Sequence, residues 1–433
     1  MNPQNKVLLR QKIYILLYIM SVLIIFILNY SQPGQAFFDI FFSDRSDTGM
    51  DFFNPVIYAS GGLRNMFTSM DGITYPALAV VLFRFLYKSL PSSILIECNN
   101  DITILRGNQF LLMQYVICIL ITVVCTTILI QKIMLKSNGK DILPTFPPLI
   151  CLSYGMVYGI ERGNIVIFMP MLIFFFLYYK DDSRWYMREL ALLGLATAAG
   201  LKIYPAFWGI LLIQEKRIWD SLRTIIYGAI FLVGPMIYYG GINSIIKWIY
   251  NLTGFNTIAG NISDLSGCGA VQLSRTFCYI LNLDSDISAN IYSFAGKMQI
   301  VVCFLLITSI FVLKRNWEKY LAIVFLMIFF PRWSNDYCYM YFSIPFLYLI
   351  CDKKTDRESS VYYVMLSLVT LIYLLPKFIN FYDQKYAFEI SDLVRQIAVV
   401  CMFIALCFYT IKQIITSIYH HKFNFITNHT NLE

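Results

Sequence analysis

The chain has 433 residues, of which 58% are hydrophobic and only 14% are charged, and its formal net charge is +8. An ordinary globular domain carries about 25% charged residues, so this composition excludes a soluble enzyme, a disordered chain and a nucleic-acid-binding module. The Lys and Arg residues are spread over short segments between apolar runs, a pattern typical of the cytoplasmic loops of membrane proteins. We therefore predict an integral protein of the lipid bilayer with no nucleic-acid partner.

The N-terminal segment carries Lys6, Arg10 and Lys12 and no acidic residue, and an apolar run follows over residues 13–29. This run is too long for the apolar part of a signal peptide, and no cleavage motif of small residues follows it. It predicts a first transmembrane helix with a cytoplasmic N-terminus, in a multi-pass protein of the plasma or inner membrane.

Residues 31–74 differ from the runs around them, because they hold five Asp residues and several Gly residues. This composition predicts a loop outside the membrane core, on the non-cytoplasmic side. Within the loop, residues 52–60 are aromatic and apolar, which predicts a helix lying along the membrane interface.

Further apolar runs that could span or enter the membrane cover residues 75–90, 109–131, 146–160, 164–179, 189–213, 224–240, 292–313, 320–331, 337–351, 361–376 and 394–411. A spanning helix needs about 20 residues, and several of these runs are shorter, as tilted, broken or re-entrant helices would be. We predict one integral all-α polytopic domain with about 11–13 transmembrane helices, followed by a polar cytoplasmic tail over residues 412–433.

Basic clusters orient the bundle. The clusters that place their loops in the cytoplasm are Lys180/Arg184/Arg188, Lys216/Arg217/Arg223, Lys314/Arg315/Lys319 and Lys353/Lys354/Arg357. The loop 241–291 and the short turn 332–336 are then external. Two regions stay open: either 75–90 is re-entrant or the loop with Lys132 breaks the rule, and the run 189–213 is either one span or two half-helices meeting near Lys202.

Three groups of polar residues are candidates for a site. Asp47 and Asp51 precede the predicted interfacial helix, where a carboxylate can act as a general base or a metal ligand, or can remain a solvated loop charge. Glu161-Arg162-Gly163-Asn164 forms a charged turn between apolar runs; Arg162 suits a phosphate, but a Glu–Arg pair could simply close the turn. Lys202 lies inside an apolar run, so it is a functional candidate by default.

A fourth polar segment is the turn Pro331-Arg332-Trp333-Ser334-Asn335-Asp336-Tyr337, on the same predicted side as the first external loop. It could contribute Arg332 or Asp336 to a site there, or be a plain turn with aromatic anchors. Two cysteines, Cys268 and Cys278, share a polar loop, and they are either a disulfide or two free thiols.

Several of these segments resemble the membrane glycosyltransferases of family 87. The resemblance rests on Asp51-Phe52-Phe53, on Thr74-Tyr75-Pro76-Ala77-Leu78, on Arg162-Gly163-Asn164 and on Lys202-Ile203-Tyr204-Pro205, and it is clearest over residues 44–240. The family often shows Tyr-Pro-Pro, where this chain has Ala77 at the second proline. A related mannosyltransferase carries Asp-x-Asp in this loop, whereas Gly49 precedes Asp51 here, so we predict no metal or other cofactor.

The resemblance implies a GT-C fold and a hexosyltransferase, with mannose as the favoured sugar. It implies a polyprenyl-phosphate donor, a glycolipid or surface-polysaccharide acceptor, and a reaction on the external face with inversion. Asp51 or Asp47 is then the general base, and the residues that bind substrate are Arg162, Asn164, Lys202, Tyr204, Tyr75 and Arg332. The alternatives are a transporter or flippase of polyprenyl-linked sugars, and a polymerase or ligase of lipid-linked glycans.

Overall fold

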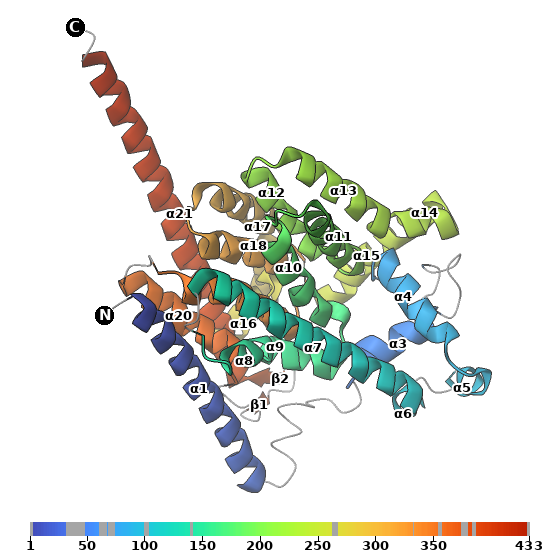
Figure 1. The fold of residues 1–433 in the computed structure, drawn as a ribbon. Coiled ribbons are helices and arrows are strands. Elements are labelled where there is room, and N and C mark those ends of the chain that lie inside the picture. Colours follow the sequence, from blue (N-terminus) through green and yellow to red (C-terminus); the bar gives the residue numbers. More distant parts are fainter. Residues whose placement is uncertain are drawn as a thin grey trace.

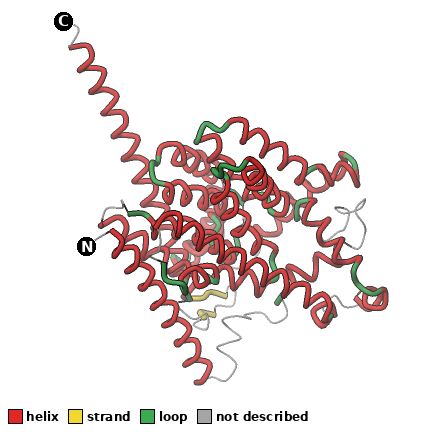
Figure 2. Tube along the Cα trace, viewed as in Figure 1, coloured by secondary structure: helices red, strands yellow, loops and turns green. Residues whose placement is uncertain are grey.

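The computed structural model describes residues 3–31, 48–59, 67, 74–98, 104–138, 142–261, 267–331, 333–353, 357–373, 380–382 and 387–430. The described chain forms a bundle of helices that cross at varied angles, with one short antiparallel pair of strands, β1 (Asn380–Tyr382) and β2 (Ala387–Glu389) (Figures 1 and 2). The predicted all-α polytopic fold is therefore confirmed, with this single hairpin added.

Within the described residues, five helical segments are long and apolar enough to cross a membrane. They are formed by α1 (Pro3–Ser31), α7 (Gln109–Asn138), α13 (Ile218–Leu232) with α14 (Gly234–Gly240), α17 (Ser285–Val312) and α21 (Ile390–Thr430). The last of these helices continues far into the predicted polar tail. A total of 11–13 spans stays a prediction, because the other apolar runs form shorter helices.

The shorter helices inside these runs are α8 (Phe146–Cys151), α9 (Tyr154–Arg162), η3 (Ile165–Ile167), α10 (Phe168–Tyr179), α11 (Trp185–Leu201), η4 (Tyr204–Gly209), α12 (Ile210–Gln214), α18 (Asn316–Phe329), η5 (Asp336–Phe342), α19 (Ser343–Cys351) and α20 (Arg357–Leu371). Helix α4 (Ala77–Lys88) occupies the run 75–90, and the helices outside the runs are α3 (Met50–Tyr58), α5 (Ser92–Cys98), α6 (Ile104–Gly107), α15 (Ile242–Asn261) and α16 (Ala270–Ile280). The segment 241–291 is thus largely helical. Cys268 and Cys278 are both buried free thiols, so they form no disulfide.

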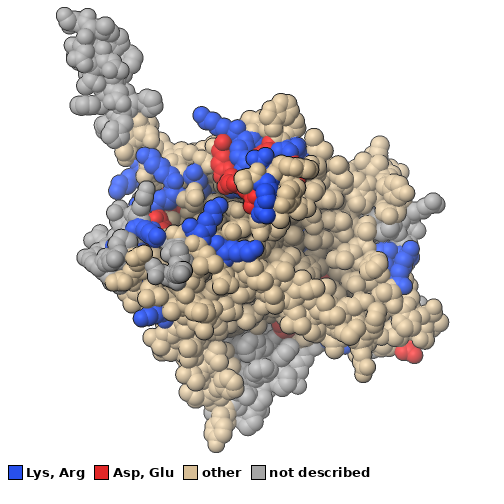
Figure 3. Space-filling model, in the orientation of Figure 1, with Lys and Arg blue, Asp and Glu red and all other residues tan. Residues whose placement is uncertain are grey.

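The basic segments meet at one end of the bundle, which we call the basic end. Lys132 near the end of α7 donates to the Tyr179 hydroxyl at 3.2 Å, next to Lys180, and Arg10 of α1 donates to the Leu349 carbonyl at 2.9 Å. Figure 3 shows the charged side chains gathered where the C-terminal part of α21 projects, while most of the remaining face is uncharged.

The opposite end, which we call the far end, holds α3 to α6. Arg106 just before α7 contacts the Met50 sulfur at 3.0 Å, and Arg84 of α4 donates to the Ala59 carbonyl at 3.0 Å. The 12 residues of α4 extend only about 18 Å, so α4 is too short to cross. The chain therefore returns to the level of Met50 before α7 begins, which favours the re-entrant alternative for 75–90 and leaves Lys132 at the basic end.

The run 189–213 is a hairpin of two half-helices, as one of the two alternatives predicts. Helix α11 starts after Arg184 at the basic end and stops at Lys202, whose φ of −149° and ψ of 131° are extended. The chain then returns through η4 and α12 to Glu215, which binds Lys180 at 2.6 Å. Pro205 stands in the first turn of η4 and cannot donate a helical N–H hydrogen bond. The sequence therefore explains why the helix does not continue through this position.

Two glycines one helical turn apart allow α9 to pack tightly on η5. A Cβ at Gly155 would lie 2.2 Å from the Met340 nitrogen, and one at Gly159 would lie 3.0 Å from the Met340 side chain and 3.5 Å from the Cβ of Tyr337. Small residues at this spacing let helical backbones approach closely in membrane proteins. This contact brings η5, and Tyr337 with it, next to the turn at Arg162.

Candidate functional site

Asp51 in the first turn of α3 is the centre of a polar cluster at the far end. Its Oδ2 accepts a hydrogen bond from Asn164 Nδ2 at 2.8 Å, and its Oδ1 lies 3.3 Å from Arg162 Nη2. The side chain is 25% exposed, so the carboxylate is partly shielded but can be reached. The predicted residues Asp51, Arg162 and Asn164 are therefore in direct contact, although 111 and 113 positions separate them in sequence.

The backbone holds these two segments together. Gly49 donates its N–H to the Glu161 carbonyl at 2.8 Å, and Thr48 donates its hydroxyl to Glu161 Oε1 at 2.8 Å. Gly163 has a φ of +72°, and a Cβ there would lie 2.8 Å from the Gly49 carbonyl oxygen. Only glycine satisfies both the left-handed backbone and this close approach, so Gly163 is required for Asp51 to meet Arg162.

Asn164 is fixed in position by its own turn. Its side-chain oxygen accepts from the Val166 N–H at 3.1 Å and so caps η3, while the residue as a whole is only 2% exposed. The cap orients the amide so that Nδ2 faces Asp51, and the Tyr75 hydroxyl lies 3.5 Å from the same nitrogen. A buried amide held in this way can orient the carboxylate without competing for its proton.

Lys202 reaches the cluster from the tip of the α11 hairpin. Its Nζ lies 4.5 Å from the ring centroid of Tyr75 and 5.9 Å from that of Tyr204, a range in which ring faces attract a cation. Its charge also acts on Asp51. The structure therefore brings Tyr75 and Tyr204 together around Lys202, beside Asp51.

Burial raises the pKa of the Asp51 carboxyl above its usual value, while the hydrogen bond from Asn164 and the charge of Lys202 oppose that rise. Desolvation disfavours the ionised form, and a donor or a cation favours it. A carboxylate with a raised pKa holds a proton more readily than a solvated Asp does, which suits a general base.

The turn 331–337 contributes Tyr337 rather than Asp336. Tyr337 is within electrostatic range of Asp51, Tyr75 and Tyr204. Asp336 is buried instead against Tyr154, whose hydroxyl donates to it at 2.9 Å.

The ring of Tyr154 also lies 3.6 Å from the Arg395 guanidinium carbon, so this second buried polar group is built on α9, η5 and α21. Asp47 and Arg332, both predicted site residues, lie outside the described residues.

Sequence reasoning missed Gly163, Thr48 and Tyr337 as parts of the site. A glycine directly after a charged residue at a helix end signals a left-handed cap, so Gly163 had a local signal. Tyr337 had none, because its place depends on the packing of η5 on α9.

The cluster combines one carboxylate with cations and aromatic rings. Within the described residues, no group of three or more His, Cys, Asp or Glu could hold a metal ion. One base beside Arg and Lys is suited to activating a hydroxyl next to an anionic group.

Comparison with known proteins identifies a family. The model of glycosyltransferase family 87 matches residues 74–331, which is more than half of the chain. The matched range contains Tyr75, Arg162, Asn164, Lys202 and Tyr204, and it starts after Asp51. No match was found among curated proteins or among solved structures.

Proposed function

The chain belongs to glycosyltransferase family 87, and we propose that it transfers a hexose, with mannose favoured, from a polyprenyl-phosphate donor to a glycolipid or surface-polysaccharide acceptor. The transfer takes place at the far end of the bundle and inverts the anomeric carbon. The observation that carries this proposal is the convergence of Asp51 with Arg162 and Lys202 from three separate segments of an apolar bundle.

In this mechanism Asp51 is the general base. It takes the proton of the acceptor hydroxyl while that oxygen attacks the anomeric carbon, and the bond from that carbon to the phosphate oxygen breaks. The electron pair leaves with the polyprenyl phosphate. Because phosphate is a good leaving group, no carboxylic acid is needed to protonate it, and Asp51 as the base is sufficient.

Arg162 and Lys202 stabilise the departing phosphate in this proposal. A donor phosphate competes with Asp51 for Arg162, so donor binding both anchors the sugar and releases the carboxylate to accept a proton. Charge-assisted hydrogen bonds to phosphate are strong in a partly desolvated site. The aromatic rings of Tyr75 and Tyr204 keep Lys202 directed at the same space.

The sidedness of the reaction follows from the basic end. Lys and Arg are enriched in cytoplasmic loops, which supports a cytoplasmic basic end and N-terminus and an external far end in the plasma membrane. Thiol labelling in a background without native cysteines tests this. Ser183→Cys should react from the cytoplasmic side and Ser92→Cys from the outside, and the reverse pattern would overturn the assignment.

The experiment for the activity is a transfer assay with purified protein in vesicles. A panel of polyprenyl-phosphate sugars carrying radiolabel is offered with an acceptor extract, and label in the acceptor identifies the donor. Transfer from polyprenyl-phosphate mannose is the expected result. Movement of labelled donor across the vesicle membrane with no transfer to acceptor would instead establish a flippase, and joining of whole lipid-linked glycans would establish a polymerase.

A further inference from the structure

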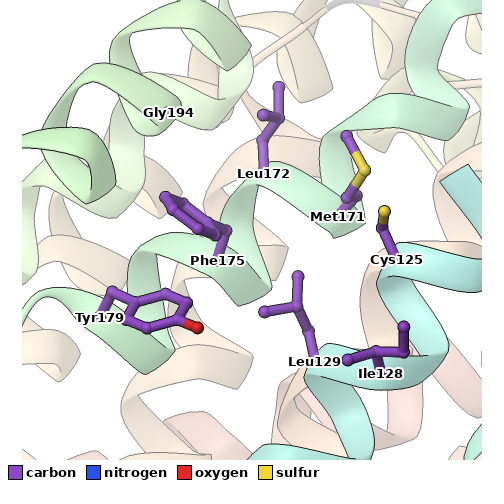
Figure 4. Close-up of a pocket in the computed structure, with 8 residues that line it drawn as sticks. All are labelled: Cys125, Ile128, Leu129, Met171, Leu172, Phe175, Tyr179 and Gly194. Atoms are coloured by element: carbon purple, nitrogen blue, oxygen red, sulfur yellow. The ribbon is translucent and has the colours of Figure 1, made fainter. Parts of the chain in front are cut away.

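A groove of about 350 Å³ lies between α7, α10 and α11, away from Asp51. Its lining is almost entirely apolar and consists of Cys125, Ile128, Leu129, Met171, Leu172, Phe175, Tyr179 and Gly194. Figure 4 shows side chains of α7 and α10 on two sides of it, with Gly194 of α11 above Phe175 in this view. A Cβ at Gly194 would come within 3.3 Å of the Phe175 ring, so glycine leaves this space open.

The groove opens onto the part of α7 that faces lipid. Ile121, Val124 and Ile128 stand three and four residues apart on one face of this helix, and they are 55%, 54% and 44% exposed. Because α7 is long and apolar enough to span the membrane, this exposed row borders the acyl chains of the bilayer. The groove is therefore a recess in a surface that lipid already covers.

Two lysines stand at the end of the groove that is nearest the basic end. Lys132 follows Ile128 and Leu129 by one helical turn, and its Nζ donates to the hydroxyl of the groove residue Tyr179 at 3.2 Å. Lys136 is one turn further, with Nζ 5.7 Å from the Tyr178 ring centroid. Neither lysine forms an ion pair within the part of the chain that the structure describes.

We propose that this groove binds an anionic phospholipid, with one acyl chain between α7, α10 and α11 and the phosphate beside Lys132 and Lys136. The commitment to an anionic lipid rests on charge complementarity, because neither lysine has an ion-pair partner among the described residues, and Asp182, on which Lys136 acts, is already bound by Arg184 at 2.9 Å. Lysines near a membrane surface attract anionic headgroups, and their apolar stems reach along the helix to do so.

The bound lipid would hold α10 and α11 at a fixed separation, and these helices position residues of the proposed active site. Helix α10 begins four residues after Asn164, and α11 ends just before Lys202. Both helices contribute walls of the groove: Gly194 lies about 12 Å from Lys202 along α11, and the groove residues of α10 lie about 10–22 Å from Asn164 by helical rise. A lipid that fills the groove therefore fixes their separation where Asn164 and Lys202 project.

Native mass spectrometry of the full-length protein tests the headgroup preference. Phosphatidylglycerol should be retained more strongly than phosphatidylcholine with the same acyl chains, and it should raise the thermal unfolding temperature more. Lys132→Gln and Lys136→Gln should each weaken phosphatidylglycerol binding about fivefold and leave phosphatidylcholine unchanged. Lys412→Gln on α21, which does not line the groove, is the matched control and should change neither.

A second variant tests the groove itself. Ile128→Trp places a large ring at its mouth and should abolish the preference for phosphatidylglycerol, while Ile225→Trp on the exposed face of α13 should preserve it. Equal retention of the two lipids by the native protein would overturn the proposal, as would an unchanged preference in the double lysine variant. Displacement of phosphatidylglycerol by an equimolar polyprenyl phosphate would assign the groove to the donor and also overturn it.

Discussion

Charges at the two ends of the bundle are arranged in different ways. At the basic end they bind one another: Lys180 lies 2.6 Å from Glu215, and hydrogen bonds from the side chain and the backbone of Arg184 lower the pKa of Asp182 to about 2. At the far end, burial raises the pKa of Asp51 despite its cationic neighbours.

An exposed pair such as Arg184 with Asp182 contributes little to stability, whereas ionisable groups inside an apolar bundle mark a function. The type of a charged residue therefore does not tell whether it orients the protein in the membrane or belongs to a functional site. The burial and the neighbours of the charge distinguish the two.

The largest expected effect is on the transfer rate, and it should differ between Asp51 at the far end and Asp182 at the basic end. Asp51→Asn removes the proposed base and should lower the transfer rate about 10²–10⁴-fold, while the asparagine can still bind its neighbours and preserve folding. Asp182→Asn at the basic end is the matched control and should change the rate less than about twofold. Initial rates of label transfer, with thermal unfolding measured in parallel, decide this. Near-normal turnover of Asp51→Asn combined with loss in Asp47→Asn would transfer the role of base to Asp47.

Substituting Met for Lys202 at the far end and for Lys180 at the basic end compares the two ends of the bundle again. Lys202→Met keeps the apolar stem but removes a charge-assisted bond to the phosphate, so donor affinity should fall about 10- to 100-fold. Lys180→Met should leave donor affinity unchanged and lower the unfolding temperature, because Lys180 is only 5% exposed and Glu215 would keep only the longer contact with Arg217 at 3.7 Å. Donor affinity is measured by titration and stability by thermal unfolding.

If Lys202→Met left donor affinity unchanged and raised stability, Lys202 would be a structural charge and the proposed phosphate site would lack it. Arg162→Lys tests the other cation, because a point charge cannot reproduce a planar bidentate fork. It should weaken donor binding while the folded fraction stays constant.

Two glycines with a positive φ give the next prediction. Gly241 has a φ of 68° and a ψ of −174°, with nothing within 4 Å of an added Cβ, whereas at Gly163 that Cβ would meet the Gly49 carbonyl. Gly241→Ala should therefore lose about 1–3 kcal/mol of unfolding free energy for the backbone strain alone and leave transfer unchanged. Gly163→Ala should also lose stability and in addition lower transfer about tenfold or more, since a misplacement of about 1 Å can cost 10²-fold in rate. Unchanged transfer in Gly163→Ala would show that the contact with Gly49 is not tight.

The pH profile tests the environment of Asp51. A base works only when ionised, so activity should be present above its pKa and disappear as pH falls through it. Because burial raises this pKa, the acidic limb of kcat/KM should lie above the titration of an ordinary Asp.

Asn164→Asp retains the cap on Val166 but removes the donor to Asp51 and adds a like charge, so the limb should shift to higher pH. Asp182→Asn should not shift it.

Much of the fold follows from the sequence, since every predicted apolar run contains a helix and Pro205 indicates the break beside Lys202. Lys202 is also predictable as a site residue, because an isolated charge in an apolar run has few structural explanations, while Asp51 and Arg162 are singled out by their resemblance to family 87 segments. Their convergence is not predictable from local pattern, because it depends on glycine contacts such as Gly163 on Gly49 that join distant segments.

The position of α4 in the bundle and the partners of Asp336 also could not be predicted from the local sequence. The short length of α4 and the contact of Arg106 with Met50 together indicate that α4 does not cross. Asp336 binds Tyr154, which is 182 positions away. Hydrophobic periodicity tells which face of a helix is buried, but it does not tell which helix covers that face.

The smallest expected effect concerns Tyr75, which contacts the cluster in two ways. Its hydroxyl lies 3.5 Å from Asn164 Nδ2, at the limit of a hydrogen bond, so Tyr75→Phe should lower donor affinity at most about threefold. The ring is the stronger contact, with Lys202 Nζ 4.5 Å from its centroid, and a desolvated cation–π contact contributes about 0.5–2 kcal/mol. Tyr75→Leu removes the ring and should lower donor affinity about tenfold, with little change in unfolding temperature.

In the Lys202→Met background the two Tyr75 variants should behave alike, because the cation that distinguishes a ring from an aliphatic side chain is gone. A tenfold loss from Tyr75→Leu that persisted in that background would mean that Tyr75 contacts the donor itself and does not act by positioning Lys202.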